Sequence, residues 1–123
     1  MKIGYIDISL FSSTIYDQFK RELEKLEKEN ISGLVIDVRG NSGGYLSGVT
    51  DILNLFLKKG DVIYQLESGN KKQIKKDTTK EKRDYPVAVL VNGGSASASE
   101  ILASAIKESY NGYVVGTKTY GKG

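Results

Sequence analysis

The most constraining feature of this sequence is an apolar run that ends abruptly in a glycine turn. Val87–Val91 reads V-A-V-L-V, and Asn92-Gly93-Gly94 follows directly. A helical pattern then begins, with apolar residues on one face at Ile101, Leu102, Ala105 and Ile106. This order predicts a buried strand, a tight turn and the N-terminus of a helix. Backbone N–H groups of a first helical turn lack intrahelical partners, so such a junction can serve chemistry.

Three serines stand at this junction, namely Ser95, Ser97 and Ser99. Ser97 and Glu100 fit the S-x-x-E capping box, so the stretch read alone favours a structural role for Ser97 over a nucleophile. The chain contains no histidine and no cysteine, which excludes a Ser-His-Asp triad and a thiol nucleophile. A serine enzyme built from this sequence therefore needs a lysine or a carboxylate as its base.

Length and composition indicate one globular domain. The chain has 123 residues, of which 39% are hydrophobic and 27% charged, and no apolar run approaches the length of a membrane helix. The net charge of +3 comes from one segment, since residues 68–84 hold seven Lys or Arg and three Asp or Glu. No aromatic residue interrupts these charges, so we interpret 68–84 as a polar basic hairpin or loop and expect no nucleic-acid partner.

The rest of the chain alternates between strand and helix patterns. Strands are predicted at 2–9, 34–38, 61–67, 87–91 and 113–116, and helices at about 14–29, 45–57 and 98–110. In the first strand, Ile3 and Tyr5 are the expected buried residues, with Ile6 and Ile8 as further candidates. Leu34–Val38 is apolar on both faces, which predicts a central strand in a sheet covered on both sides. The alternation predicts an α/β domain.

A second glycine-rich turn, Arg39 to Gly44, follows the strand at 34–38. It lacks both the P-loop lysine and the G-x-G-x-x-G pattern, which argues against a phosphate cradle. Gly43-Gly44 either directs a free N–H at a developing oxyanion or only permits positive φ, and the residues alone leave both open. We expect the two glycine-rich turns to lie at the same edge of the sheet.

Three segments together resemble the tail-specific, or C-terminal processing, serine peptidases. They are Leu34–Leu46 (L-V-I-D-V-R-G-N-S-G-G-Y-L), Val91–Leu102 (V-N-G-G-S-A-S-A-S-E-I-L) and Val115–Gly123 (V-G-T-K-T-Y-G-K-G). The resemblance covers essentially the whole chain. It implies an α/β fold with a ClpP/crotonase-like core of stacked β-β-α units, residues 1–123 being the catalytic core. The family's PDZ domain and its C-terminal strands are expected to lie outside these residues.

The resemblance also implies the roles of individual residues. Ser97 takes the position of the nucleophile and Lys122 that of the general base, while the N–H groups of Gly43 and Ala98 take those of the oxyanion hole. Ser42 stands where the family usually has proline. Ser95 and Ser99 are expected to be structural.

The resemblance implies polypeptide substrates, no metal or organic cofactor, and action outside the cytoplasm (periplasmic, cell-envelope or secreted). Any membrane tether is expected in segments beyond these residues. If later strands are missing, the sheet exposes an unpaired edge, so we expect a homo-oligomer.

Two other functions remain open from the sequence. One is a noncatalytic peptide- or ligand-binding module on the same fold. The other, less favoured, is a crotonase-like acyl-CoA enzyme, because that chemistry does not need a serine followed by a lysine in G-K-G. Labelling by a serine-directed reagent distinguishes the peptidase from both, since only an activated serine reacts.

Overall fold

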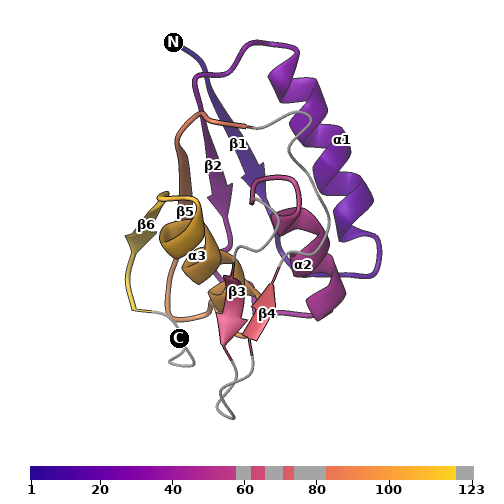
Figure 1. The fold of residues 1–123 in the computed structure, drawn as a ribbon, viewed down its shortest axis with the longest axis vertical. Helices are drawn as coiled ribbons and strands as arrows, with labels where there is room; N and C mark the ends of the chain where they lie inside the picture. The colour runs from indigo at the N-terminus through magenta and orange to yellow at the C-terminus, as the bar shows by residue number, and fades with distance from the viewer. Residues whose placement is uncertain (58–61, 66–70, 74–82, 119–123) are drawn as a thin grey trace.

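The computed structural model describes residues 1–57, 62–65, 71–73 and 83–118. Its elements, in chain order (Figure 1), are β1 (Ile3–Asp7), α1 (Ile15–Glu27), β2 (Gly33–Asp37), α2 (Leu46–Leu53), β3 (Val62–Gln65), β4 (Lys71–Gln73), β5 (Val87–Val91), α3 (Ala98–Ser109) and β6 (Tyr113–Gly116). The predicted alternation of strands and helices is confirmed. None of these helices is long and apolar enough to cross a membrane.

The main sheet has four strands in the order β1-β2-β5-β6, and every neighbouring pair is parallel. Because parallel strands end at the same edge, the turns that follow β2 and β5 must meet there. The predicted central position of β2 is confirmed. β3 and β4 form a separate antiparallel pair that contacts α3. β4 falls within the predicted hairpin at 68–84, most of which lies outside the described residues.

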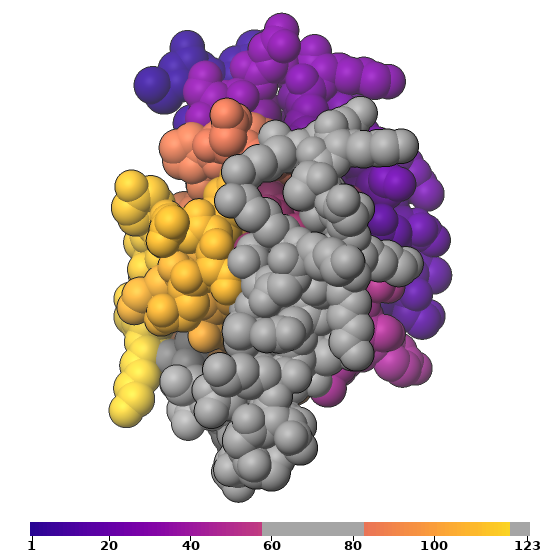
Figure 2. All heavy atoms as spheres, in the orientation of Figure 1, coloured from indigo at the N-terminus to yellow at the C-terminus, as the bar shows by residue number. Residues whose placement is uncertain are grey.

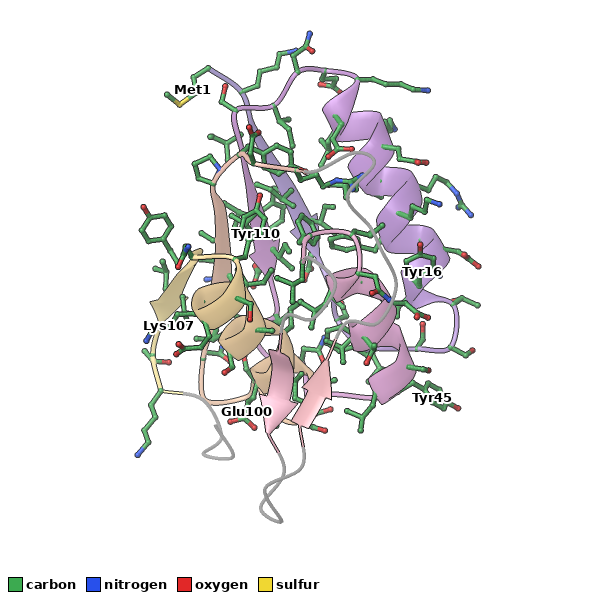
Figure 3. All side chains as sticks on the ribbon, in the orientation of Figure 1. Met1, Tyr16, Tyr45, Glu100, Lys107 and Tyr110 are labelled. Carbon is green, nitrogen blue, oxygen red and sulfur yellow. The ribbon has the colours of Figure 1, made fainter. Side chains whose placement is uncertain are left out.

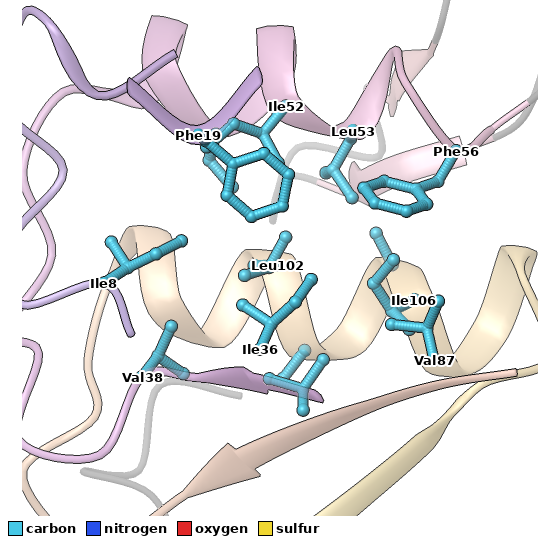
Figure 4. Packing of buried hydrophobic residues seen from close by; sticks show 14 of the residues in the cluster. Ile8, Phe19, Ile36, Val38, Ile52, Leu53, Phe56, Val87, Leu102 and Ile106 are labelled. Carbon is cyan, nitrogen blue, oxygen red and sulfur yellow. The ribbon is translucent and has the colours of Figure 1, made fainter. Parts of the chain in front are cut away.

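One hydrophobic core joins the three helices to the sheet (Figure 4). In α1, Ile15, Phe19 and Leu23 recur every four residues and are all buried, as an amphipathic helix requires. Their partners from the other helices and from the sheet are Ile36, Ile52, Leu53, Val87, Val89, Leu102 and Ile106. Each fully buried side chain of this size contributes roughly 1.5–3 kcal/mol to folding. In the space-filling view, α1 and the α3–β6 pair lie at opposite sides of the molecule (Figure 2).

The predicted burial of Ile3 and Tyr5 is wrong. These side chains are 55% and 54% exposed, whereas Ile6 and Ile8 are 8% and 1% exposed. Successive side chains of a strand point to opposite faces, and in β1 the even-numbered residues face the helices. On the second face, Tyr113 is also exposed. The prediction of a sheet covered on both sides therefore fails for the described part of the chain.

A polar cluster ties α1 to the segment that precedes β5. Arg83 donates from Nε to Glu27 Oε2 at 2.7 Å and from Nη2 to Glu27 Oε1 at 3.0 Å. Its Nη1 donates to the carbonyl of Leu55, just after α2, at 3.0 Å, and the Tyr85 hydroxyl donates to Glu27 Oε2 at 2.6 Å. Burial raises the pKa of Tyr85, and it raises the pKa of Tyr110, which donates to the Tyr85 carbonyl, to about 12. One carboxylate thus organises three segments of the chain.

We expect Glu27→Ala to lower the free energy of unfolding by about 2–3 kcal/mol, because it removes charge-assisted hydrogen bonds and leaves Arg83 without its carboxylate. The matched control is Glu29→Ala. Glu29 lies 3.8 Å from Lys2 with both side chains more than half exposed, so its loss should cost less than about 0.5 kcal/mol. Urea denaturation measures both values. Equal losses would show that the Glu27 cluster adds nothing beyond an ordinary surface pair.

Candidate active site

The two glycine-rich turns are hydrogen-bonded to each other at the carboxyl edge of the sheet. The N–H of Gly40 donates to Asn92 Oδ1 at 2.9 Å, and the N–H of Ala96 donates to the carbonyl of Asn41 at 3.0 Å. The Asn92 side chain also accepts from the N–H of Gly94 at 2.9 Å. The prediction that both turns share one edge is confirmed.

The structure separates the three serines that follow Asn92-Gly93-Gly94 by their surroundings. Ser95 Oγ donates to the Val38 carbonyl at 2.7 Å, and Ser99 Oγ donates to the Asn41 carbonyl at 2.9 Å. Both residues are fully buried, whereas Ser97 is exposed. The prediction that Ser95 and Ser99 are structural is confirmed. Among the three, Ser97 is the serine that a substrate can reach.

Ser97 has an unusual backbone conformation, with φ 55° and ψ −118°. This combination lies outside the small left-handed helical region that non-glycine residues tolerate, and such conformations cost of order 1–3 kcal/mol. The sharp strand-to-helix turn resembles the strained elbow that presents the nucleophile in α/β hydrolases. The Ser97 N–H donates to Glu100 Oε1 at 3.0 Å, which confirms the predicted support of the helix start by Glu100. Figure 3 shows Glu100 at the end of α3 that lies away from Tyr110.

Gly43 lies directly against Ser97. A Cβ atom at position 43 would be 2.7 Å from Ser97 Cβ and 3.2 Å from Ser97 Oγ, and Gly43 has φ +115°. Both facts require glycine there. Its N–H donates to Asn41 Oδ1 at 2.8 Å, so this expected oxyanion donor has an acceptor within the protein.

The N–H of Ala98 differs from those of its neighbours. Ser97, Ser99 and Glu100 each donate from the backbone to an acceptor in the same turn. For the Ala98 N–H, the described part of the chain offers no hydrogen-bond acceptor. It belongs to the first turn of α3, where free N–H groups carry partial positive charge. A donor of this kind, next to Ser97, suits a developing anion.

Lys122 lies outside the described residues. The chain that leads toward it passes beside the glycine turn at 92–94, because Thr117 N–H donates to the Val91 carbonyl at 3.3 Å. The Lys118 carbonyl oxygen lies 3.9 Å from the position of a Cβ on Gly93. Lys122 follows Lys118 by four positions, which span at most about 14 Å. The last described residues therefore lie at the same edge of the sheet as Ser97.

A charged cluster that the sequence analysis did not identify lies where β2 ends. Asp37, whose side chain is 6% exposed, accepts from Arg39 Nε at 3.0 Å and from Arg39 Nη2 at 2.9 Å. The Tyr5 hydroxyl also donates to Asp37. The guanidinium of Arg39 holds the pKa of Asp37 well below its usual range. In the sequence, the one sign of this cluster was Asp37 itself, a charged residue in an apolar strand. Nothing in the sequence indicated that the distant Tyr5 would be its partner.

An exposed serine at a strained strand-to-helix turn, at the carboxyl edge of a parallel sheet, is a geometry that α/β hydrolases use to present a nucleophile. The sequence profile of peptidase family S41 matches residues 2–123. The chain belongs to this family. The predicted resemblance and fold class are thereby confirmed.

Individual relatives agree with this assignment. The chain is 49% identical to the carboxy-terminal processing protease CtpB of Bacillus subtilis (strain 168) over 98% of its own length and 25% of that protein. It is 41% identical to CtpA of the same organism, again over 98% of the chain and 26% of the relative. The solved structure of the photosystem II D1 C-terminal processing protease matches with a TM-score of 0.85 and 33% identity, over 98% of this chain and 32% of that one. The chain thus spans about a quarter of the curated relatives.

The contact between Gly43 and Ser97 makes a testable prediction about two glycines in one turn. Gly40 has φ +74° with nothing within 4 Å of an added Cβ, so Gly40→Ala should cost only backbone strain, about 1–2 kcal/mol. Gly43→Ala adds a collision with Ser97 and should cost more than about 3 kcal/mol. Chemical denaturation of both variants measures the difference. A Gly43→Ala loss no larger than that of Gly40→Ala would contradict the contact.

The Asp37 cluster predicts a pH dependence. A carboxyl whose folded pKa is depressed contributes stability above its unfolded pKa of about 3.9, and this contribution is lost as the pH falls toward the folded value. The stability advantage of the parent over Asp37→Asn should therefore shrink between about pH 5 and about pH 2. Arg39→Met should show the same trend, because it removes the cation that lowers the pKa. A pH-independent advantage in denaturation experiments would refute the proposed charge pairing.

Proposed function

We propose that this chain is the catalytic core of a serine peptidase that cleaves polypeptides near their C-termini, with Ser97 and Lys122 as its catalytic dyad. The observation that carries the proposal is an exposed Ser97, in a strained turn, with the backbone of Gly43 packed against it. Membership of peptidase family S41 and relatives named carboxy-terminal processing proteases support it. Since the chain spans about a quarter of those relatives, the activity of the whole protein is part of the proposal.

Because the sequence contains no histidine, the base is a lysine or a carboxylate, and we assign this role to Lys122. A free lysine has a pKa of about 10.4, whereas an effective base at neutral pH works near 7–8. The required shift of roughly three units corresponds to about 4 kcal/mol of bias against the ammonium form. Burial in an apolar pocket supplies such a bias when no carboxylate lies alongside.

In the acylation step, neutral Lys122 Nζ takes the proton from Ser97 Oγ, and the oxygen attacks the carbonyl carbon of the scissile peptide bond. The carbonyl oxygen becomes an oxyanion, which the N–H groups of Ala98 and Gly43 stabilise together with the N-terminus of α3. Collapse of this intermediate breaks the C–N bond. The leaving amine takes the proton from the Lys122 ammonium, which leaves an ester on Ser97.

Deacylation repeats the same steps with water. Neutral Lys122 removes a proton from the water molecule, whose oxygen attacks the ester carbon. The second tetrahedral intermediate uses the same N–H groups, and its collapse returns the proton to Ser97 Oγ. The product has a new carboxyl terminus. No step requires a metal ion or an organic cofactor.

The proposal is tested in the complete protein that contains this chain, by casein cleavage and by labelling with a fluorophosphonate probe. Ser97→Ala should abolish both, because the nucleophilic oxygen is lost. Lys122→Ala should lower both by at least about 10³-fold. Lys122→Arg should be equally inactive, since a guanidinium stays protonated and cannot act as a base.

Lys118→Ala is the matched control for the loss of a lysine near the chain's last residues. Its side chain is exposed, and we expect unchanged labelling. Circular dichroism establishes that each variant is folded. Labelling that persists in folded Ser97→Ala would rule out Ser97 as the nucleophile, and a parent protein that neither labels nor cleaves would favour a binding module. Action outside the cytoplasm belongs to the same proposal and is tested by cell fractionation.

A further inference from the structure

Asn41 connects three separate parts of the candidate site. Its carbonyl accepts hydrogen bonds from Ala96 N–H at 3.0 Å and from Ser99 Oγ at 2.9 Å. Its side-chain Oδ1 accepts from Gly43 N–H at 2.8 Å, and its Nδ2 donates to the Ile8 carbonyl at 2.8 Å. A single residue thus holds the nucleophile turn, the Gly43 turn and the end of β1.

Because Asn41 is buried, water cannot readily replace these hydrogen bonds. The residue is 0% exposed, and its backbone N–H is also used, donating to the Val38 carbonyl at 3.1 Å. A buried polar group that loses its partner costs about 1–3 kcal/mol, because water cannot replace it. The Asn41 amide is therefore held in one orientation, and so are the groups bound to it.

Asn41 is hydrogen-bonded to residues that precede and follow the nucleophile in the chain. Ala96 and Ser99 lie before and after Ser97 in the chain, and their bonds go to the Asn41 main chain. Gly43, which packs against Ser97, is held by the Asn41 side chain. The relative position of the nucleophile and the Gly43 backbone is consequently set through this residue. Loss of its side chain would remove the acceptor of the Gly43 N–H, while the bonds to the nucleophile turn, which use the Asn41 main chain, remain.

We propose that Asn41 is a positioning residue for acylation, which orients the Gly43 N–H relative to Ser97 through its side-chain oxygen. The inference rests on the proposed function of Ser97. An N–H group can share its proton between two acceptors, so the oxyanion joins Asn41 Oδ1 as the second acceptor of a three-centre bond. The Gly43 carbonyl is held by the Phe11 N–H at 2.9 Å, and the Asn41 oxygen is the acceptor that sets the direction of the Gly43 N–H. A misplacement of about 1 Å in such a group costs about 10²-fold in rate.

The test compares Asn41→Leu with the parent in the complete protein, using a peptide substrate and the fluorophosphonate probe. Leucine has a similar size but removes both Oδ1 and Nδ2. We expect kcat and the labelling rate of Ser97 to fall about 10–100-fold with KM changed less than about threefold, because the bond acts mainly in the transition state.

A second variant, Asn41→Ser, leaves a polar space that water can occupy and should fold if Asn41→Leu does not. Its kcat should fall by about 10-fold.

Tyr110→Phe is the matched control for stability. It also removes one hydrogen bond from a side chain to a backbone carbonyl, at 2.7 Å, but far from Ser97. It should lower the denaturation midpoint without changing kcat. A folded Asn41 variant with parental kcat would overturn the proposal, as would a loss of kcat in Tyr110→Phe equal to that in the Asn41 variants. These outcomes require a parent that labels at Ser97, whereas failure of the proposed function would appear as a parent that does not label.

Discussion

The parallel pairing of β2 with β5 is the interaction on which the rest of the structure depends. It places two turns, which are 52 positions apart at the Gly40–Asn92 hydrogen bond, at one edge of the sheet. Neither turn could form the site alone, since one supplies Ser97 and the other supplies the Gly43 backbone. The three helices that cover one face hold this pairing in a hydrophobic core (Figure 4). The site is therefore a product of sheet topology rather than of any local motif.

The conformation of Ser97 has an energetic cost that the surrounding structure must offset. Strain of order 1–3 kcal/mol is a substantial fraction of a typical folding free energy of 5–15 kcal/mol. The compensation lies close by, in the buried hydroxyls of Ser95 and Ser99 and in the Glu100 carboxylate, all of which bond to the backbone. These side chains hold the turn while Ser97 stays exposed. The exposed position of one serine thus depends on the structural use of two others.

Much of this architecture could be predicted from the sequence, because apolar periodicity and glycine turns are local signals. The strands at 34–38 and 87–91, the helix after Ser97 and the meeting of the two turns followed from such patterns. The buried face of β1 did not, because Ile3 is as apolar as Ile6 and Ile8, and only the packing of the helices selects which face is buried. Asn41 gave no local signal either. Its role arises from partners such as Ile8 and Ser99, which are 33 and 58 positions away.

The Glu27 cluster has a consequence for how this domain tolerates change. It ties α1 to the segment before β5, whereas the serine turn follows the same strand at its other end. The side chains that stabilise the fold and those that hold the Ser97 turn thus lie at opposite ends of β5. Substitutions near Arg83 would alter how much folded protein a cell maintains, while the geometry of the Ser97 turn stays the same. Selection can therefore adjust the abundance of the folded protein and the geometry of the Ser97 turn as two separate quantities.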